Sequence, residues 1–202
     1  MPRMTRHHSR AARRAFTMIE LSIVVVIVGV LAVLGALGYR RYVTTAHTAE
    51  ATHLTGGIRA AQEAFKVEKG VYADVSQDTS SLYPATAPGK FVTEWGGSCT
   101  NCAKSDPDAW KHLAVRPSAP VMYGYATVAG IGGGSLAAVP PPPKVSASAF
   151  SPPGSGSGAE PIRATDPYYV TVAWGDTDAD GTPCVVMSYS TSNQLVIQSA
   201  GE

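Results

Sequence analysis

The sequence FTMIELSIVVVIVGVLAVLGAL, residues 16–37, decides the fold of this chain. From Leu21 onward, only Ser22, Gly29 and Gly35 interrupt its aliphatic run. Its length is about the 20 residues that a helix needs to cross a hydrocarbon layer of about 30 Å. We therefore predict a membrane-spanning helix over residues 16–38.

One carboxylate stands near the start of this apolar stretch, at Glu20. An ionisable side chain loses its hydration in hydrocarbon, so it persists there only when a partner or a function holds it. Glu20 is therefore the first candidate functional residue.

The residues before the stretch, 1–15, are strongly basic. They contain five arginines, two histidines and no acidic residue, which favours the cytoplasmic side of a membrane. We interpret residues 1–15 as a leader peptide. Its removal changes the formal net charge from +1 to −4, because it holds five arginines and no acid. A mildly acidic mature chain does not favour nucleic acid as a partner.

A basic leader, a small residue, then Phe-Thr-Met-Ile-Glu-Leu and an aliphatic helix resemble the N-terminal signal of type IV prepilins and pseudopilins. The resemblance implies that a prepilin peptidase cuts between Ala15 and Phe16 on the cytoplasmic side and that Phe16 is then N-methylated. It also implies that Glu20 pairs with the free amine of a neighbouring subunit during assembly. Family members usually have Gly before the cut; this chain departs from that pattern with Ala15, which is small enough to be tolerated.

The same resemblance implies a structural subunit. Such a protein enters the inner membrane as a single-pass protein with a periplasmic head, and an assembly platform in that membrane then adds it to other pilin subunits in a surface filament. A type II secretion pseudopilin and a minor pilin share the signature and stay open as alternatives. An alternative of another class is a membrane-anchored periplasmic binding or sensing domain that never polymerises, in which Glu20 has no role. An ordinary or twin-arginine signal peptide would also leave Glu20 unexplained.

The helical pattern continues over residues 39–70. Arg59 and Glu63 stand at the i,i+4 spacing of an ion pair, and Gly70 suits the end of a helix. Apolar residues at steps of four, three and four define one face: Leu54, Ile58, Ala61 and Phe65. We predict an α+β fold in which this half of a long N-terminal helix packs on a small antiparallel β-sheet head, residues 71–202.

The head has two loop-rich parts and four strand signals. Residues 73–120 form a connector with one short helix after Pro107, and residues 130–163 form a Gly-, Pro- and Ser-rich surface loop. Short runs rich in β-branched and aromatic residues predict strands at 121–128, 168–174, 184–189 and 194–198.

Three cysteines lie in the predicted head. Cys99 and Cys102 form a CxxC pattern in the connector, and Cys184 begins a predicted strand. A head beyond the inner membrane is in an oxidising compartment, which predicts a disulfide. Either Cys99 pairs with Cys102, or one of them is bonded to Cys184. We favour the long-range bond, because closing a larger loop restricts the unfolded chain more.

Asp176, Asp178, Asp180 and Gly181 copy the first half of an EF-hand calcium loop. Met187 stands where an EF-hand needs a bidentate Glu, and strands flank the loop, so an EF-hand is excluded. The two interpretations left are a weak calcium site and a solvated Asp/Gly hairpin. His47, His53 and His112 are not part of any recognisable catalytic motif, so we do not predict an enzyme.

Overall fold

The computed structural model describes residues 16–85, 88–89, 91–96, 107–131 and 166–198. Its elements are, in chain order, α1 (Met18–Lys69), α2 (Pro107–His112), β1 (Gly124–Gly130), β2 (Tyr168–Gly175), β3 (Cys184–Tyr189) and β4 (Val196–Gln198). The chain divides into two compact units, Met1–Arg40 and Arg41–Glu202. The predicted loop 130–163 lies almost wholly outside the described residues.

Helix α1 runs for 52 residues as one α-helix. Ala, Leu, Ile and Val fill most of its first half, and the four interior glycines after residue 30 do not interrupt it. It ends at Gly70, whose φ of 77° is the left-handed conformation of a helix C-cap and whose N–H donates to the carbonyl of Lys66 at 2.8 Å. The predicted end of the helix is thus confirmed.

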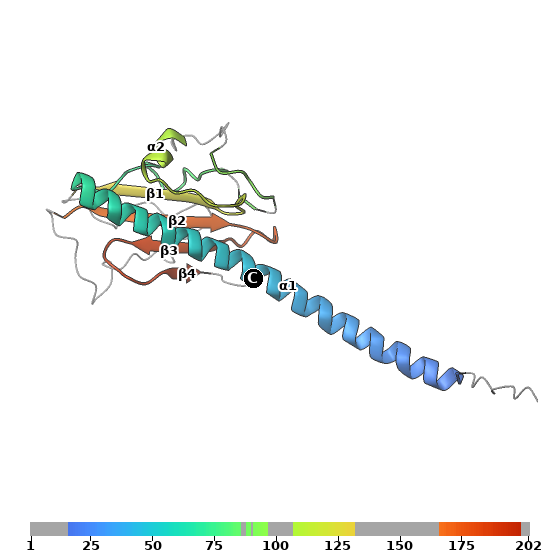
Figure 1. Ribbon diagram of the computed structural model, residues 1–202. Coiled ribbons are helices and arrows are strands. Elements are labelled where there is room, and N and C mark those ends of the chain that lie inside the picture. The colour runs from blue at the N-terminus through green and yellow to red at the C-terminus, as the bar shows by residue number, and fades with distance from the viewer. Residues whose placement is uncertain (1–15, 86–87, 90, 97–106, 132–165, 199–202) are drawn as a thin grey trace, which may run out of the picture. The chain divides into compact units, whose positions relative to one another are not determined.

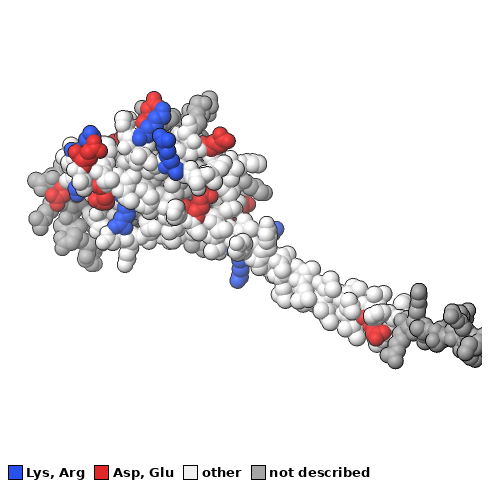
Figure 2. Space-filling view, viewed as in Figure 1, with Lys and Arg blue, Asp and Glu red and all other residues white. Residues whose placement is uncertain are grey.

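The first unit exposes its apolar side chains. Large aliphatic residues along α1 up to Leu37 are about half exposed or more, and Figure 2 shows a surface there almost without charged side chains. By length and composition, α1 is the one helix among the described residues that could cross a membrane.

The second unit contains a four-stranded antiparallel sheet in the order β1-β2-β3-β4 (Figure 1), as predicted. Its first strand is displaced from the predicted one: β1 begins at Gly124 and continues to Gly130. Val121 pairs instead with Thr93 of the connector in an isolated bridge. The last strand is shorter than predicted, because residues 190–195 are used in the turn that follows β3.

The hydrophobic core of the head lies between α1 and the sheet. Leu54 and Ile58 are buried in it, with Ala61 and Phe65 packed at its edge, so the predicted helix face is the one that packs. Alternate residues of the strands point to opposite faces. Ala173 thus joins the core under α1, while neighbouring strand residues form a second cluster on the other face of the sheet: Val170, Val172, Val185 and Met187.

The polar side chain of Gln62 lies fully buried in the face of α1 that packs on the head. Its Nε2 donates to the carbonyl of Ala73 at 2.8 Å and to Oγ1 of Thr127 at 3.0 Å, and its Oε1 accepts from the Ala73 N–H at 2.9 Å. Thr127 Oγ1 lies 2.9 Å from Thr171 Oγ1. This amide therefore joins α1, the segment after it, β1 and β2 in one satisfied network.

The prediction of an ion pair between Arg59 and Glu63 is wrong. Arg59 donates to the carbonyl oxygen of Asn193 at 2.7 Å and to its side-chain oxygen, while Glu63 accepts from the hydroxyl of Tyr72 at 3.1 Å. Both side chains hold tertiary contacts, and these replace a local pair of small value.

Replacing Gln62 with Ala is expected to lower the free energy of unfolding of the head by about 2 to 4 kcal/mol, because buried donors and acceptors lose their partners. Unfolding of the full chain in detergent, followed by tryptophan fluorescence, measures this. Glu68→Ala is the control, since Glu68 is exposed and bonds only its neighbour Lys69; it should change stability by about 0.5 kcal/mol or less. Equal effects of the two substitutions would contradict the role given to Gln62.

Candidate functional site

Glu20 lies in the first turn of α1 and bonds within its own chain. Its Oε2 accepts from the N–H of Thr17 at 2.9 Å and from the Thr17 hydroxyl at 2.8 Å. In return, Oγ1 of Thr17 accepts from the N–H of Glu20 at 3.3 Å. Thr17 directly precedes the helix, so the two residues form a capping box.

The capping box gives the carboxylate a local partner at the helix end that favours negative charge. It satisfies N–H groups that the first turn of a helix leaves without partners. Because Thr17 follows Phe16 in the chain, the carboxylate is bonded one residue away from Phe16. The carboxylate is thus fixed next to the position where cleavage would create a free amine.

Thr17 is a residue that the sequence interpretation missed. Its signal is present in the pattern Thr-x-x-Glu directly before an apolar run, which is the sequence form of a capping box. Ala15, the other residue of the predicted cleavage site, lies outside the described residues.

Cys184 is a buried free thiol at the start of β3. Its sulfur lies 3.9 Å from the hydroxyl of Thr48 on α1. The long-range disulfide that we favoured is therefore not present at Cys184. Cys99 and Cys102 lie outside the described residues, and a bond between them stays a prediction.

The loop between β2 and β3 brings Asp176, Asp178 and Asp180 together. One oxygen from each lies within 4.8 Å of the others. Backbone N–H groups of the loop bond these carboxylates, among them Gly181 to Asp176 at 3.1 Å and Thr182 to Asp180 at 2.6 Å. Gly181 has a φ of 92°, which a residue with a side chain rarely adopts.

The spacing of these oxygens fits one calcium ion. Oxygens on opposite sides of Ca²⁺ lie about 5 Å apart, because each Ca–O distance is about 2.3 to 2.6 Å. Three carboxylates provide fewer ligands than the six to eight that Ca²⁺ takes, so carbonyl groups or water would have to complete the site.

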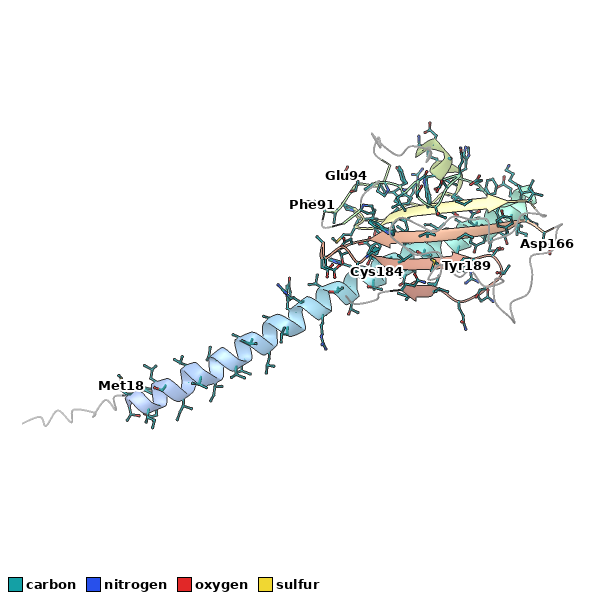
Figure 3. All side chains as sticks on the ribbon, turned by 180° about the vertical axis from the view of Figure 1, so that it is seen from behind. Met18, Phe91, Glu94, Asp166, Cys184 and Tyr189 are labelled. Atoms are coloured by element: carbon teal, nitrogen blue, oxygen red, sulfur yellow. The ribbon has the colours of Figure 1, made fainter. Side chains whose placement is uncertain are left out.

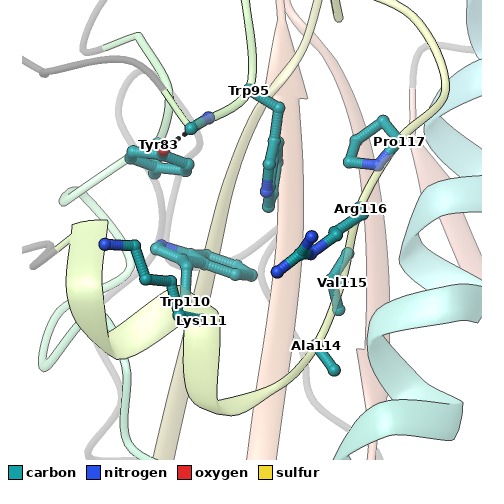
Figure 4. A pocket seen from close by; sticks show the side chains of 9 residues that line it. Tyr83, Trp95, Trp110, Lys111, Ala114, Val115, Arg116 and Pro117 are labelled. Carbon is teal, nitrogen blue, oxygen red and sulfur yellow. Dashed lines mark hydrogen bonds between the residues drawn. The ribbon is translucent and has the colours of Figure 1, made fainter.

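An aromatic cluster fixes the connector to β1, where the rings of Trp95 and Tyr125 meet with centroids 5.8 Å apart. Trp95 meets Trp110 edge-on with ring centroids 5.1 Å apart and Tyr83 at 5.0 Å, and the Tyr83 hydroxyl accepts from the Gly96 N–H at 2.8 Å (Figure 4). A cavity of about 330 Å³ opens beside these rings and Arg116. Trp110 and Tyr83 are each only 1% exposed, so their rings serve the core.

The chain has a long N-terminal helix that is apolar in its first half and carries a carboxylate in its first turn. The second half of this helix packs on a small antiparallel sheet. That is the arrangement of type IV pilin-like proteins.

Comparison with known sequences agrees with this class. The family model described as "Prokaryotic N-terminal methylation motif" matches residues 10–36. The chain is 34% identical over 83 residues to the fimbrial protein EcpC of Eikenella corrodens. The aligned region covers 41% of this chain and 53% of that protein. The chain thus aligns with about half the length of this curated relative. No solved structure matches. The chain is thus similar to a fimbrial protein, carries the N-terminal methylation motif, and has a pilin-like arrangement of helix and sheet.

Proposed function

We propose that the chain is a pilin-like structural subunit that is cut between Ala15 and Phe16, N-methylated at Phe16, and assembled into a cell-surface filament. The observation that carries the proposal is the N-terminal methylation motif at residues 10–36, in which Glu20 caps the apolar helix. The fimbrial relative supports the same function.

The proposal includes the location and the partners. The apolar half of α1 anchors the protein in the inner membrane in a single pass, with the head in the periplasm, until extraction into the filament. The partners are a prepilin peptidase, an inner-membrane assembly platform and other pilin subunits. The role is structural and not catalytic, and nucleic acid is not among the proposed partners.

In this proposal Glu20 exchanges partners during assembly. Within one chain its carboxylate accepts from Thr17, whose backbone N–H adjoins Phe16. The amine of a neighbouring subunit is a cationic donor, and a charge-assisted hydrogen bond is stronger than one from a neutral hydroxyl. Pairing in a low-dielectric filament core would then select the register in which each new helix docks.

Glu20→Ala is expected to leave cleavage and head folding intact and to remove most of the filament, because the incoming subunit loses the charge that selects its register. The measurement is the amount of protein in sheared surface material relative to the membrane fraction. Ser22→Ala is the matched control, since the Ser22 hydroxyl bonds only the carbonyl of Met18 in its own helix. Normal filament yield from Glu20→Ala would contradict the role of Glu20 and favour an anchored domain that does not polymerise.

The filament assay also separates the alternatives within the class. A major pilin appears in bulk in the sheared fraction, while a minor pilin or a type II secretion pseudopilin stays mainly with the membrane. The described head holds no feature that is specific to one of these roles.

We further propose that Asp176, Asp178 and Asp180 bind calcium and order the loop between β2 and β3. Support comes from the convergence of their oxygens within 4.8 Å. A cation would offset the repulsion of three neighbouring carboxylates and hold the two strands at this end.

Calcium is expected to raise the thermal unfolding midpoint of the full chain, because a ligand that binds only the folded state stabilises it. Asp178→Asn should remove most of this shift. Asp108→Asn is the control, since Asp108 bonds Lys111 on α2, away from the loop sequence. An equal shift with magnesium, or an unchanged calcium shift in Asp178→Asn, would contradict the site.

A further inference from the structure

The head carries an open groove along α1. One wall is the α1 face with Glu50, His53, Leu54, Gly57 and Ala61, and the other wall is the connector segment 114–121. The groove has a volume of about 500 Å³ and its exposed lining is mostly apolar. A volume of this size accommodates large apolar side chains of another molecule.

Gly57 lies in the α1 wall of this groove. Glycine is a weak helix former, so a glycine inside a long helix needs a reason. A Cβ at Gly57 would meet no atom within 4 Å, so packing within the chain does not require a glycine there. Gly57 is exposed in the wall of the groove, and its missing side chain leaves room for something outside the chain to approach the helix backbone.

The same head also presents an apolar projection, Phe91 and Val92, which are 84% and 60% exposed. The adjoining Thr93 is fixed to Val121 by two backbone hydrogen bonds of 2.7 and 2.9 Å, so the projection has a firm base. Figure 3 shows Phe91 and Glu94 at the same end of the head as Cys184, away from Asp166. Two exposed large apolar side chains in sequence are unfavourable in water unless they contact a partner.

The charges beside these two surfaces are complementary. Arg116 lines the groove, and Glu94 follows the projection. Both are exposed, and the described part of the chain provides neither with an ion-pair partner. A projection that enters a groove on another copy would bring Glu94 near the Arg116 of that copy, which favours a single orientation.

We propose that the groove between α1 and residues 114–121 receives Phe91 and Val92 of a second copy of this chain. The projection adjoins the groove wall at the Thr93–Val121 bridge. In the proposed contact each copy uses its projection on one neighbour and its groove on another, which makes the contact heterologous. Repetition of a heterologous contact that does not close into a ring produces a helical filament. The inference rests on the proposed filament and assigns the contact between heads.

Gly57→Leu fills the groove and tests its use. The added side chain starts in open space and improves helix propensity, so the monomer should fold and be processed as before, while the filament loses most of its yield. Gly56→Leu is the matched control: it makes the same change one residue earlier, also with no atom within 4 Å of the new Cβ, and Gly56 does not line the groove. Equal yields from the two variants would overturn the proposal.

Crosslinking tests the identity of the occupant. A chain with both Phe91→Cys and Gly57→Cys should form covalent multimers in sheared filaments under oxidation, beyond any background that the native cysteines give in the wild type. Phe91→Cys combined with Gly56→Cys is the control and should stay at that background. Multimers that are equally abundant in the control, or no multimers in either, would mean that another partner or none fills the groove, and would overturn the assignment.

Charge exchange provides an independent test. Glu94→Arg and Arg116→Glu should each lower filament yield, and the double exchange should restore it. Loss of yield without restoration would contradict the pairing of these charges between copies.

A wrong assignment of the contact between heads is distinguishable from a wrong proposal of filament assembly. A wild-type protein that never enters the sheared fraction contradicts the filament itself, whereas wild-type filaments without the Gly57-specific crosslink contradict only the contact between heads.

Discussion

The apolar surface of residues 16–37 is the constraint on which the biology of this protein depends. Its aliphatic side chains are exposed within the chain, and exposed apolar area costs about 25 cal/mol per Å² in water. Lipid tails satisfy this surface in a membrane, and the equivalent helices of other subunits would satisfy it in a filament. A subunit that can exchange one environment for the other can be stored in the membrane and then assembled.

That exchange requires a polar group that distinguishes one packed arrangement from another. Apolar helices pack with little preference for register, because aliphatic contacts are not directional. Glu20 is the one carboxylate in the apolar half of α1, and its bonds to Thr17 hold it at the helix start. In the proposed filament Glu20 would become buried, and there it would select register more than add stability.

The second half of α1 is governed by a different interaction. Gln62 ties the helix to the sheet and to the segment that leaves the helix, through bonds to Ala73 and Thr127. Arg59 adds a tie to Asn193 before β4. These contacts make the head and its part of α1 one folded unit, which presents the groove at Gly57 and the projection at Phe91 in fixed positions.

Much of this architecture was predictable, since it follows from periodicity and burial. The long apolar run, the faces with Leu54 and Ile58, and the β-rich runs gave the long helix and the antiparallel sheet. Glu20 stood out because a carboxylate in an apolar helix needs a reason. The capping role of Thr17 was readable from its spacing to Glu20 but was overlooked.

The contacts that were not predicted join residues far apart in the chain. Gln62 looks like a polar interruption of an apolar face, and its partner Thr127 is 65 positions away. The Arg59–Asn193 bond spans 134 positions and replaced an expected local pair. The preference for a disulfide at Cys184 rested on loop entropy alone, whereas the position of Cys184, buried beside Thr48, depends on how α1 packs on β3.

The most direct test of the central claim is the intact mass and N-terminal sequence of the protein recovered from membranes and from sheared surface material. We predict a chain that begins with N-methylated Phe16 in both fractions, since processing precedes assembly. A chain that still carries the leader and is found only in the membrane would contradict this prediction, and the protein would then be an anchored domain and not a filament subunit.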